Sequence, residues 1–163
     1  MKRIHPEEAL DALDRRILEA LQADGRLTLV ELAERVGLSA SPCLRRMRRL
    51  EEDGFISGYR ASLDRARIGL GLTVFMGIKV DGHRDENAAA LGAAIQAMPE
   101  VVACHVVSGA ADFLLEVVVP DLAHYERLLF GTVLKLPMVK DVQSHFALRT
   151  VKPASPLPFD HLA

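Results

Sequence analysis

Residues 41–54 read SPCLRRMRRLEEDG, and this stretch predicts an amphipathic helix that runs to about Asp53. Ser41 is a natural N-cap residue, and Pro42 suits the first helical position, where its missing N–H costs nothing. Apolar residues at helical spacing define the buried stripe, and these are Leu44, Met47 and Leu50. The opposite side then carries four guanidinium groups, which belong to Arg45, Arg46, Arg48 and Arg49.

Two shorter helices are predicted ahead of this one. Apolar residues recur at spacings of three and four from Leu10 to Leu21, which is typical of a helix with one buried side. A second helix begins at Thr28, because this side chain and that of Glu31 can each bind the other's backbone N–H. Gly37 can adopt the left-handed conformation that ends a helix and turns the chain sharply. The three helices together form a helix-turn-helix pattern.

The second half of the chain predicts a sheet with helices on one face. Strands are expected at residues 72–80, 101–107, 113–119 and 139–151, and helices at residues 87–98 and 122–133. This βαββαβ order is that of a ferredoxin-like domain, so the fold class is α+β. The other sheet face has no covering layer, and it most economically packs against a second subunit. We therefore expect a homodimer.

These patterns divide the chain into four parts. They are a helix-turn-helix domain at residues 1–62, a linker at 63–71, a ferredoxin-like domain expected to dimerise at 72–152, and a tail at 153–163. Residues 55–63 are expected to form a short extended segment, either a small wing or a connecting strand. The tail carries three prolines by Pro158 and should be irregular and mobile.

Composition limits the classes of function. The net charge of −2 argues against a protein that coats DNA over its whole surface, so any DNA contact must be local. Aromatic residues make up only 5% of the chain, which disfavours a single-strand nucleic-acid binder. The two cysteines lie far apart without a cluster of histidines, and strand histidines such as His105 and His145 are more often packing or surface residues than ligands. We therefore expect no metal, no disulfide framework and no cofactor.

Targeting and membrane segments are not expected either. The first residues lead directly into acidic, amphipathic sequence without an apolar stretch of signal-peptide length, and no apolar run is long enough for a bilayer. These observations favour a cytoplasmic protein that makes no membrane contact.

The arginine-bearing helix predicts double-stranded DNA as a partner. Such a helix fits the major groove, and arginine can bind guanine or phosphate. Side-chain hydroxyls and free N–H groups at the helix start can bind phosphates. The predicted DNA-binding residues are Ser39, Ser41, Pro42, Arg45, Arg46 and Arg49. Arg48 lies nearest the predicted stripe and is expected to pair with Glu52. The alternative is that all four arginines form a solvated face, paired with acidic residues one turn on.

The turn at residues 108–112, SGAAD, predicts a small-molecule site. Gly109 lets backbone N–H groups approach a carboxylate, and Asp112 supplies a negative partner for an ammonium group. A zwitterionic amino acid needs both. The alternative is a plain hairpin turn, for which glycine and aspartate are common choices.

The chain resembles the Lrp/AsnC (leucine-responsive regulator) family along nearly its whole length. The matching stretches are LDALDRRIL at 10–18, LAERVGLS at 32–39 and PCLRRMRRLEEDGFI at 42–56. The resemblance implies a sequence-specific transcription regulator that forms dimers and octamers and binds an amino-acid effector between C-terminal domains. The family's turn usually reads Gly-acidic-Tyr-Asp. Ser144 falls where the family tends to carry a hydroxyl that faces the ligand of a neighbouring subunit, whereas Val142 replaces the other usual hydroxyl. The expected effector-binding residues are Gly109, Ala110, Ala111, Asp112 and Ser144.

Other readings remain open at this point. A small enzyme on the ferredoxin-like half would need a nucleophile–base pair, paired carboxylates, a phosphate loop or a metal cluster, and none of these patterns occurs. An architectural DNA binder without sequence preference would show a steep salt dependence and almost no specificity. Cys43, beside the arginines, is either a thiol of lowered pKa or, as we favour, a small buried side chain between helices.

Overall fold

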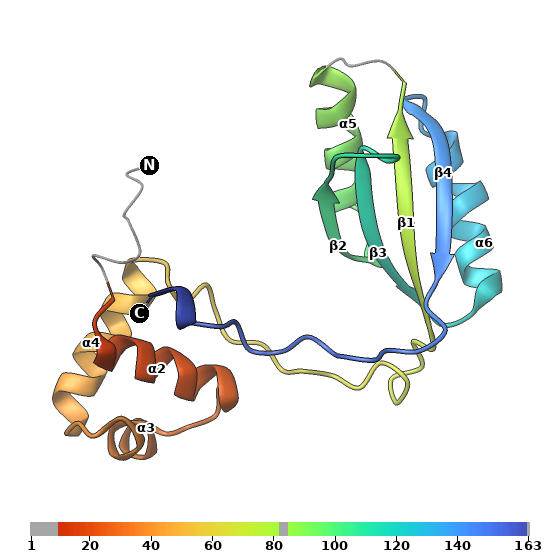
Figure 1. Cartoon of the computed structure of the whole chain (residues 1–163). Coiled ribbons are helices and arrows are strands. Elements are labelled where there is room, and N and C mark those ends of the chain that lie inside the picture. The colour runs from red at the N-terminus through yellow and green to blue at the C-terminus, as the bar shows by residue number, and fades with distance from the viewer. Residues whose placement is uncertain (1–9, 82–84, 163) are drawn as a thin grey trace. The chain divides into compact units, whose positions relative to one another are not determined.

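The computed structural model describes residues 10–81 and 85–162 and divides into two compact units (Figure 1). The helical unit consists of the chain up to Ser62 together with the segment from Lys152 onward, and the sheet unit spans Leu63–Val151. Residues 1–9, on which the expected absence of a targeting segment rests, lie outside the described part. Among the described residues, no helix is long and apolar enough to cross a membrane.

Three helices form the helical unit, and local capping sets where they begin and end. They are α2 (Ala12–Ala23), α3 (Leu29–Val36) and α4 (Ala40–Glu52). The Thr28 hydroxyl accepts a bond from the Glu31 N–H at 3.3 Å, and the Glu31 carboxylate accepts from the Thr28 N–H at 2.7 Å, so the predicted capping pair is confirmed. Gly37 ends α3 with φ of +75°, as expected for the turn into α4.

The start and the buried side of α4 differ from the prediction. The N-cap is Ser39 rather than Ser41, so Pro42 is the third helical residue, a position in the first turn where the backbone N–H has no partner within the helix. Cys43 and Leu50 are fully buried, whereas Leu44 and Met47 are only half-buried. The buried stripe is therefore centred closer to Cys43, which fills the space between helices as favoured above.

The C-terminal segment packs on the helical unit. Its backbone is irregular as predicted, apart from the short 3-10 helix η2 (Asp160–Leu162), but the expectation of a mobile tail is wrong. Leu162 belongs to the buried apolar cluster of the three helices, and Phe159 packs against that cluster. Residues 55–62 are extended without forming a strand, and the Tyr59 hydroxyl donates a hydrogen bond to Glu51 at 3.0 Å.

The sheet unit has the predicted ferredoxin-like plan. Its strands are β1 (Leu72–Val80), β2 (Val101–Val106), β3 (Phe113–Val119) and β4 (Val139–Phe146). They form one antiparallel sheet in the order β2-β3-β1-β4 (Figure 1). β4 is shorter than predicted because its neighbour β1 begins at Leu72, and beyond the bond from the Ala147 N–H to the Thr73 carbonyl no strand remains to pair with.

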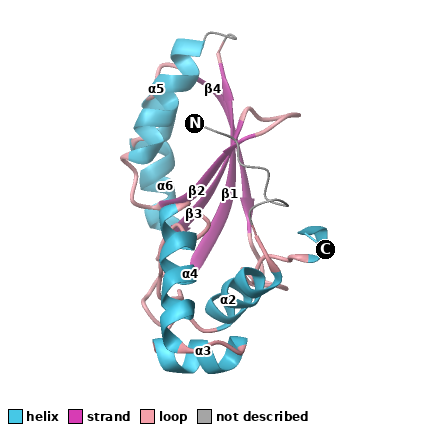
Figure 2. Cartoon of the chain, turned by 90° about the vertical axis from the view of Figure 1, so that its left-hand side faces the viewer, coloured by secondary structure: helices cyan, strands magenta, loops and turns pink. Residues whose placement is uncertain are grey.

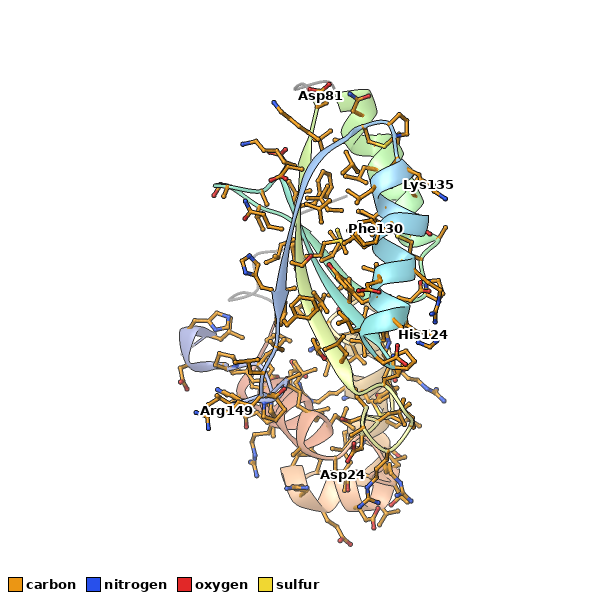
Figure 3. All side chains as sticks on the ribbon, turned by 90° about the vertical axis from the view of Figure 1, so that its right-hand side faces the viewer. Asp24, Asp81, His124, Phe130, Lys135 and Arg149 are labelled. Atoms are coloured by element: carbon orange, nitrogen blue, oxygen red, sulfur yellow. The ribbon has the colours of Figure 1, made fainter. Side chains whose placement is uncertain are left out.

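Two helices, α5 (Asp85–Gln96) and α6 (Leu122–Gly131), cover one face of the sheet (Figure 2). A single turn of 3-10 helix, η1 (Val133–Lys135), follows α6 and takes up the end of the helix predicted at 122–133. His124 and Lys135 lie on the side of this layer that points away from the sheet (Figure 3). The covered face holds the apolar core, whose largest fully buried members include Met76, Ile78 and Leu115.

The uncovered face of the sheet is less apolar than predicted. Alternation along the strands places Phe75 and Leu114 on it, but the same face carries Glu116, His105 and His145. Arg65, from the linker, donates a hydrogen bond to Glu116 at 2.7 Å. The face therefore combines apolar side chains with titratable ones.

Candidate functional sites

The outer side of α4 presents a shallow basic groove. Arg45 and Arg48 are exposed, and neither forms an ion pair within residues 10–81 and 85–162. The groove has a volume of about 590 Å³, and its lining includes Ser41, Leu44 and Glu52 besides the arginines. Ser39 and Ser41 are also exposed near the start of the helix. The α4 groove thus offers two uncommitted cations and two hydroxyls on one helix.

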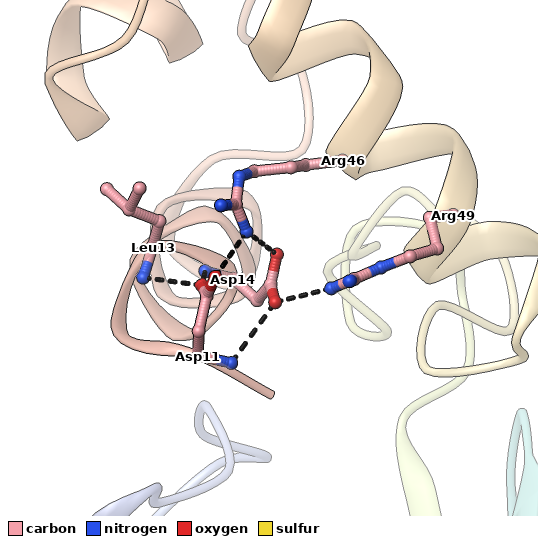
Figure 4. Close-up of polar contacts among 5 residues, drawn as sticks. All are labelled: Asp11, Leu13, Asp14, Arg46 and Arg49. Carbon is pink, nitrogen blue, oxygen red and sulfur yellow. Dashed lines mark hydrogen bonds and ion pairs between the residues drawn. The ribbon is translucent and has the colours of Figure 1, made fainter. Parts of the chain in front are cut away.

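Two of the predicted DNA-binding arginines are committed to the protein itself (Figure 4). The Nη1 atom of Arg46 donates to Asp11 Oδ2 at 2.6 Å and to Asp14 Oδ1 at 2.8 Å. Arg49 donates to the second Asp14 oxygen, which also accepts from the Asp11 N–H at 3.1 Å. Asp14 is only 1% exposed, so these partners satisfy a buried charge. Arg46 and Arg49 therefore fasten α4 to α2.

The positions predicted for Arg46 and Arg48 relative to the buried stripe are reversed. Arg48 was expected beside the buried stripe and paired with Glu52, but it is exposed, and the described residues show no ion pair between the two. The Arg46 side chain is instead the more buried, at 24% exposed, against 46% for Arg49. The reason is the position of the stripe near Cys43, which turns Arg46 toward α2 and Arg48 outward.

Asp11, Asp14, Arg46 and Arg49 form a cluster that we call the Asp14 cluster. Its contacts shift the pKa values of Arg46 and Asp11. The hydrogen bonds that Arg46 donates to the Asp11 and Asp14 carboxylates raise the pKa of Arg46 above its ordinary value. Burial alone would raise the pKa of Asp11, but bonds from the Asp14 N–H and from Arg46 outweigh it, and the pKa is lowered. Burial raises the pKa of the Cys43 thiol, so the alternative of an activated thiol beside the arginines is wrong.

The turn at residues 108–112 is open but already part of the sheet's hydrogen bonding. Gly109 has φ of +120°, a conformation that favours glycine, and a Cβ there would meet nothing within 4 Å. Asp112 accepts a bond from the Val80 N–H at 2.9 Å, at the point where the register of β1 and β4 shifts. One carboxylate oxygen of Asp112 thus has a structural role. Ala111 lies over Gly77, where a Cβ would come within 3.1 Å of the Ala111 Cβ.

Ser144 lies on the face of β4 that the helices cover. Its hydroxyl shares a short hydrogen bond with the hydroxyl of Tyr125, a buried residue of α6 whose ring makes an edge contact with Phe146 at 5.4 Å between centroids. Within one chain, Ser144 is therefore bonded to Tyr125 and lies apart from the 108–112 turn, and its expected contact with the ligand of a neighbouring subunit stays a prediction. Burial raises the pKa of Tyr125, although the bond with Ser144 opposes the shift.

Sequence reasoning missed Asp14 and Tyr125. A signal for Asp14 was present, because Asp11 and Asp14 stand in the N-cap and N3 positions of a capping box. No comparable local signal marks Tyr125, since its partner lies nineteen residues away in β4. Within the described part of the chain, no group of three or more histidine, cysteine or carboxylate side chains could hold a metal ion.

Comparison with known proteins identifies both units. Residues 10–57 match a family described as winged helix-turn-helix DNA-binding, and residues 73–157 match the Lrp/AsnC ligand binding domain. The chain is 43% identical over 152 residues to the leucine-responsive regulatory proteins of Salmonella typhimurium and Escherichia coli K12, covering 93% of this chain and 93% of each relative.

Solved structures agree with this assignment over nearly the full length. A transcriptional regulator of Neisseria meningitidis, solved as an L-Met complex, aligns with a TM-score of 0.90 at 38% identity, covering 94% of this chain and 99% of that one. An AsnC family regulator of Agrobacterium tumefaciens aligns with a TM-score of 0.88 at 39% identity, covering 94% and 100%. The reading of the sheet unit as an enzyme is thereby wrong, and the chain belongs to the Lrp/AsnC family of DNA-binding transcription regulators.

Proposed function

We propose that this regulator inserts the outer side of α4 into the major groove of duplex DNA and that Arg45 and Arg48 make its main contacts. The observation that carries the proposal is the division of labour on α4, where Arg46 and Arg49 hold the helix and the other two arginines face outward without partners among the described residues. Arg49 is still 46% exposed, and its guanidinium has donors left for a phosphate.

The start of α4 supplies the phosphate contacts in this proposal. Ser39 and Ser41 are exposed, and the Ser39 side chain makes no cap bond within its own helix. Pro42 packs half-buried in the first turn and sets its shape rather than contributing a donor. Free N–H groups and the helix dipole favour an anion at this end.

The test is binding of the full-length protein to a duplex selected from random sequence by the wild-type protein. Arg45→Ala and Arg48→Ala should each weaken binding by about 5- to 150-fold if the lost contact is to a base, as expected from ~1–3 kcal/mol per contact. Arg127→Ala removes the same charge from exposed α6 and serves as the matched control. Wild-type affinity in both α4 variants would refute the proposal.

Salt dependence separates sequence-specific from sequence-blind binding. A specific regulator prefers the selected duplex over scrambled DNA at every salt concentration, and loss of a phosphate contact reduces the salt slope by about 1. An architectural protein would bind both duplexes alike with a steep slope. Equal affinity for the two duplexes would favour the architectural function. Both activities require access to DNA, so we propose a cytoplasmic location for the protein.

For the sheet unit, we infer an amino-acid effector that binds at the 108–112 turn. Gly109 leaves open space beside the backbone, and the Asp112 oxygen that Val80 does not use is available for an ammonium group. Ala110 and Ala111 leave the turn without the family's acidic and aromatic side chains. The L-Met complex of the Neisseria relative supports this ligand class. Ser144 is not included, because its hydroxyl is bonded to Tyr125.

A thermal-shift screen against the twenty amino acids tests the effector. An amino acid that raises Tm at millimolar concentration should lose most of its effect in Asp112→Asn, which removes the charge but keeps an oxygen for the Val80 N–H. Asp141→Asn, an exposed change on β4, is the control. No stabilising amino acid, or one that acts equally on Asp112→Asn, would contradict this site.

The uncovered sheet face is the proposed homodimer surface. Phe75 is its exposed apolar centre, while Glu116 and His145, which pair with it in register on the two neighbouring strands, make the surface polar around it. Phe75→Glu should convert the dimer to monomers in analytical ultracentrifugation, and Phe130→Glu, on exposed α6, should not. If Phe130→Glu alone reduces a larger assembly to dimers, octamers form through α6. An unchanged dimer in Phe75→Glu would overturn the assignment.

A further inference from the structure

The C-terminal segment binds the helical unit through its backbone. The Leu157 N–H donates to Gln22 Oε1 at 2.7 Å, and Gln22 Nε2 donates to the Leu157 carbonyl at 3.2 Å. Pro156 and Pro158 have no N–H, so Leu157 carries the one backbone donor of this tripeptide. The Gln22 amide on α2 therefore satisfies both the N–H and the carbonyl of Leu157, which is the one residue of this tripeptide that has both groups.

Apolar contacts continue the docking toward the C-terminus. Leu162 is 9% exposed and belongs to the same buried cluster as Leu18 and Leu32, and Phe159 packs against that cluster. A groove of about 740 Å³ separates α2 from residues 55–62, and Leu157 and Phe159 form part of its wall. The Leu157 side chain itself stays exposed, so its backbone and the next two apolar residues carry the contact.

We propose that residues 157–162 are a docking motif for the surface of α2 beside this groove and that the chain's own C-terminal segment occupies that surface. The motif follows β4 in the chain, so docking connects the sheet unit to the helical unit a second time, in addition to the linker before Leu72. The three prolines between residues 153 and 158 lower the entropy lost when the segment becomes ordered. This docking is independent of the DNA and effector sites proposed above.

Hydrogen exchange of the full-length protein tests the polar part of the motif. The Leu157 amide lies between two prolines, so its exchange reports on Gln22 directly. Gln22→Ala, a favourable substitution for an exposed helical position, should accelerate that exchange by about tenfold or more while the β1 amides keep wild-type protection. Equal protection of Leu157 in the wild type and the variant would overturn the proposal.

Thermal unfolding tests the apolar part. Leu162→Asp should lower the Tm of the helical unit by about 5 °C or more, because a charge then replaces a buried side chain. The matched control is Ala154→Asp, which places the same charge on an exposed position of the same segment and should leave Tm unchanged. Equal Tm values for the two variants would contradict docking.

Crosslinking decides whether the segment comes from the same chain. In a Cys104→Ser background, Ala23→Cys and Ser155→Cys place thiols beside Gln22 and Leu157 without touching either. A short bismaleimide should join them within one chain, at a yield independent of protein concentration. Crosslinked dimers from a mixture of two chains, one with Ala23→Cys and the other with Ser155→Cys, would show that a second subunit supplies the segment. That result, or no crosslink at all, overturns the proposal.

Discussion

The interactions that stabilise the helical unit differ from those that stabilise the sheet unit. In the helical unit, two arginines of α4 bind the buried carboxylate of Asp14 on α2, so ionic hydrogen bonds join the helices. In the sheet unit, the core between sheet and helices is apolar, and its described buried residues include no charged side chain. Cys43 and Leu50 of α4 also belong to the apolar cluster of the three helices. The position of α4 is therefore fixed by buried charge in addition to apolar packing, whereas apolar packing alone fixes the helices on the sheet.

The largest effect should come from breaking the Asp14 cluster. Asp14→Ala removes three hydrogen bonds to a buried carboxylate, from Arg46, Arg49 and the Asp11 N–H, and each bond to a charged group contributes ~1.5–3 kcal/mol, so the loss should exceed about 3 kcal/mol. Urea unfolding followed by circular dichroism measures this loss, since the chain has no tryptophan. Asp11→Ala, at a half-exposed N-cap, should cost about 1 kcal/mol. Similar losses in the two variants would show that the Asp14 charge does not hold the unit.

An intermediate effect on stability is expected in the sheet unit, where the close packing of Gly77 against Ala111 sets the cost of a larger side chain. Gly77→Val places side-chain atoms against Ala111, and overpacking of this kind costs about 1–3 kcal/mol. Gly92→Ala in α5 is the control, because its Cβ would meet nothing within 4 Å and alanine favours the helix by ~1 kcal/mol. The two substitutions should shift the urea midpoint in opposite directions. A stabilised Gly77→Val would mean that the turn moves freely away from β1.

The contrast also explains what could be predicted from the sequence. β1 and β3 begin and end where their apolar runs do, because burial of these runs depends on local pattern alone. The prediction misplaced the side of α4 that faces α2. It left the fully buried Cys43 out of the apolar stripe, and it therefore directed Arg46 outward. The docking of the C-terminal segment depends on Gln22, 135 residues earlier, and no periodicity reports a contact at that distance.

The 108–112 turn was predictable only in part. Glycine and aspartate at positions 109 and 112 mark a turn by their chemistry, and the structure places both there. The bond from the Val80 N–H to Asp112 could not be predicted, because it forms at an irregularity between β1 and β4. Ser144 was assigned by family position, but its register partner on β1 is the buried Met76, which places Ser144 on the covered face.

A smaller effect separates exposed from buried ion pairs. Arg65 and Glu116 in the sheet unit form the same type of pair as Arg46 and Asp14, but they are more exposed. Glu116→Gln should therefore cost less than about 1 kcal/mol, and the cost should disappear in 1 M salt. Urea titrations at low and high salt measure both values. A cost equal to that of Asp14→Ala would remove burial as the distinction between the two units.

The smallest effect concerns the two tyrosines, one in each unit, and is confined to high pH. Burial and the hydrogen bond to Glu51 raise the pKa of Tyr59 from 10.0 to about 12, and burial raises that of Tyr125. A pKa raised in the folded state favours folding below pH 10, and this contribution is lost as pH rises from 10 to 12.

Absorbance at about 295 nm should show less than half of the phenolate signal at pH ~11, where a free phenol is mostly ionised. In Tyr59→Phe the remaining signal belongs to Tyr125, and stability should fall less steeply between pH 10 and 12 than in the wild type. If Tyr59→Phe follows the wild-type curve, the bond to Glu51 does not persist in solution, and residues 55–62 are held by apolar contacts alone.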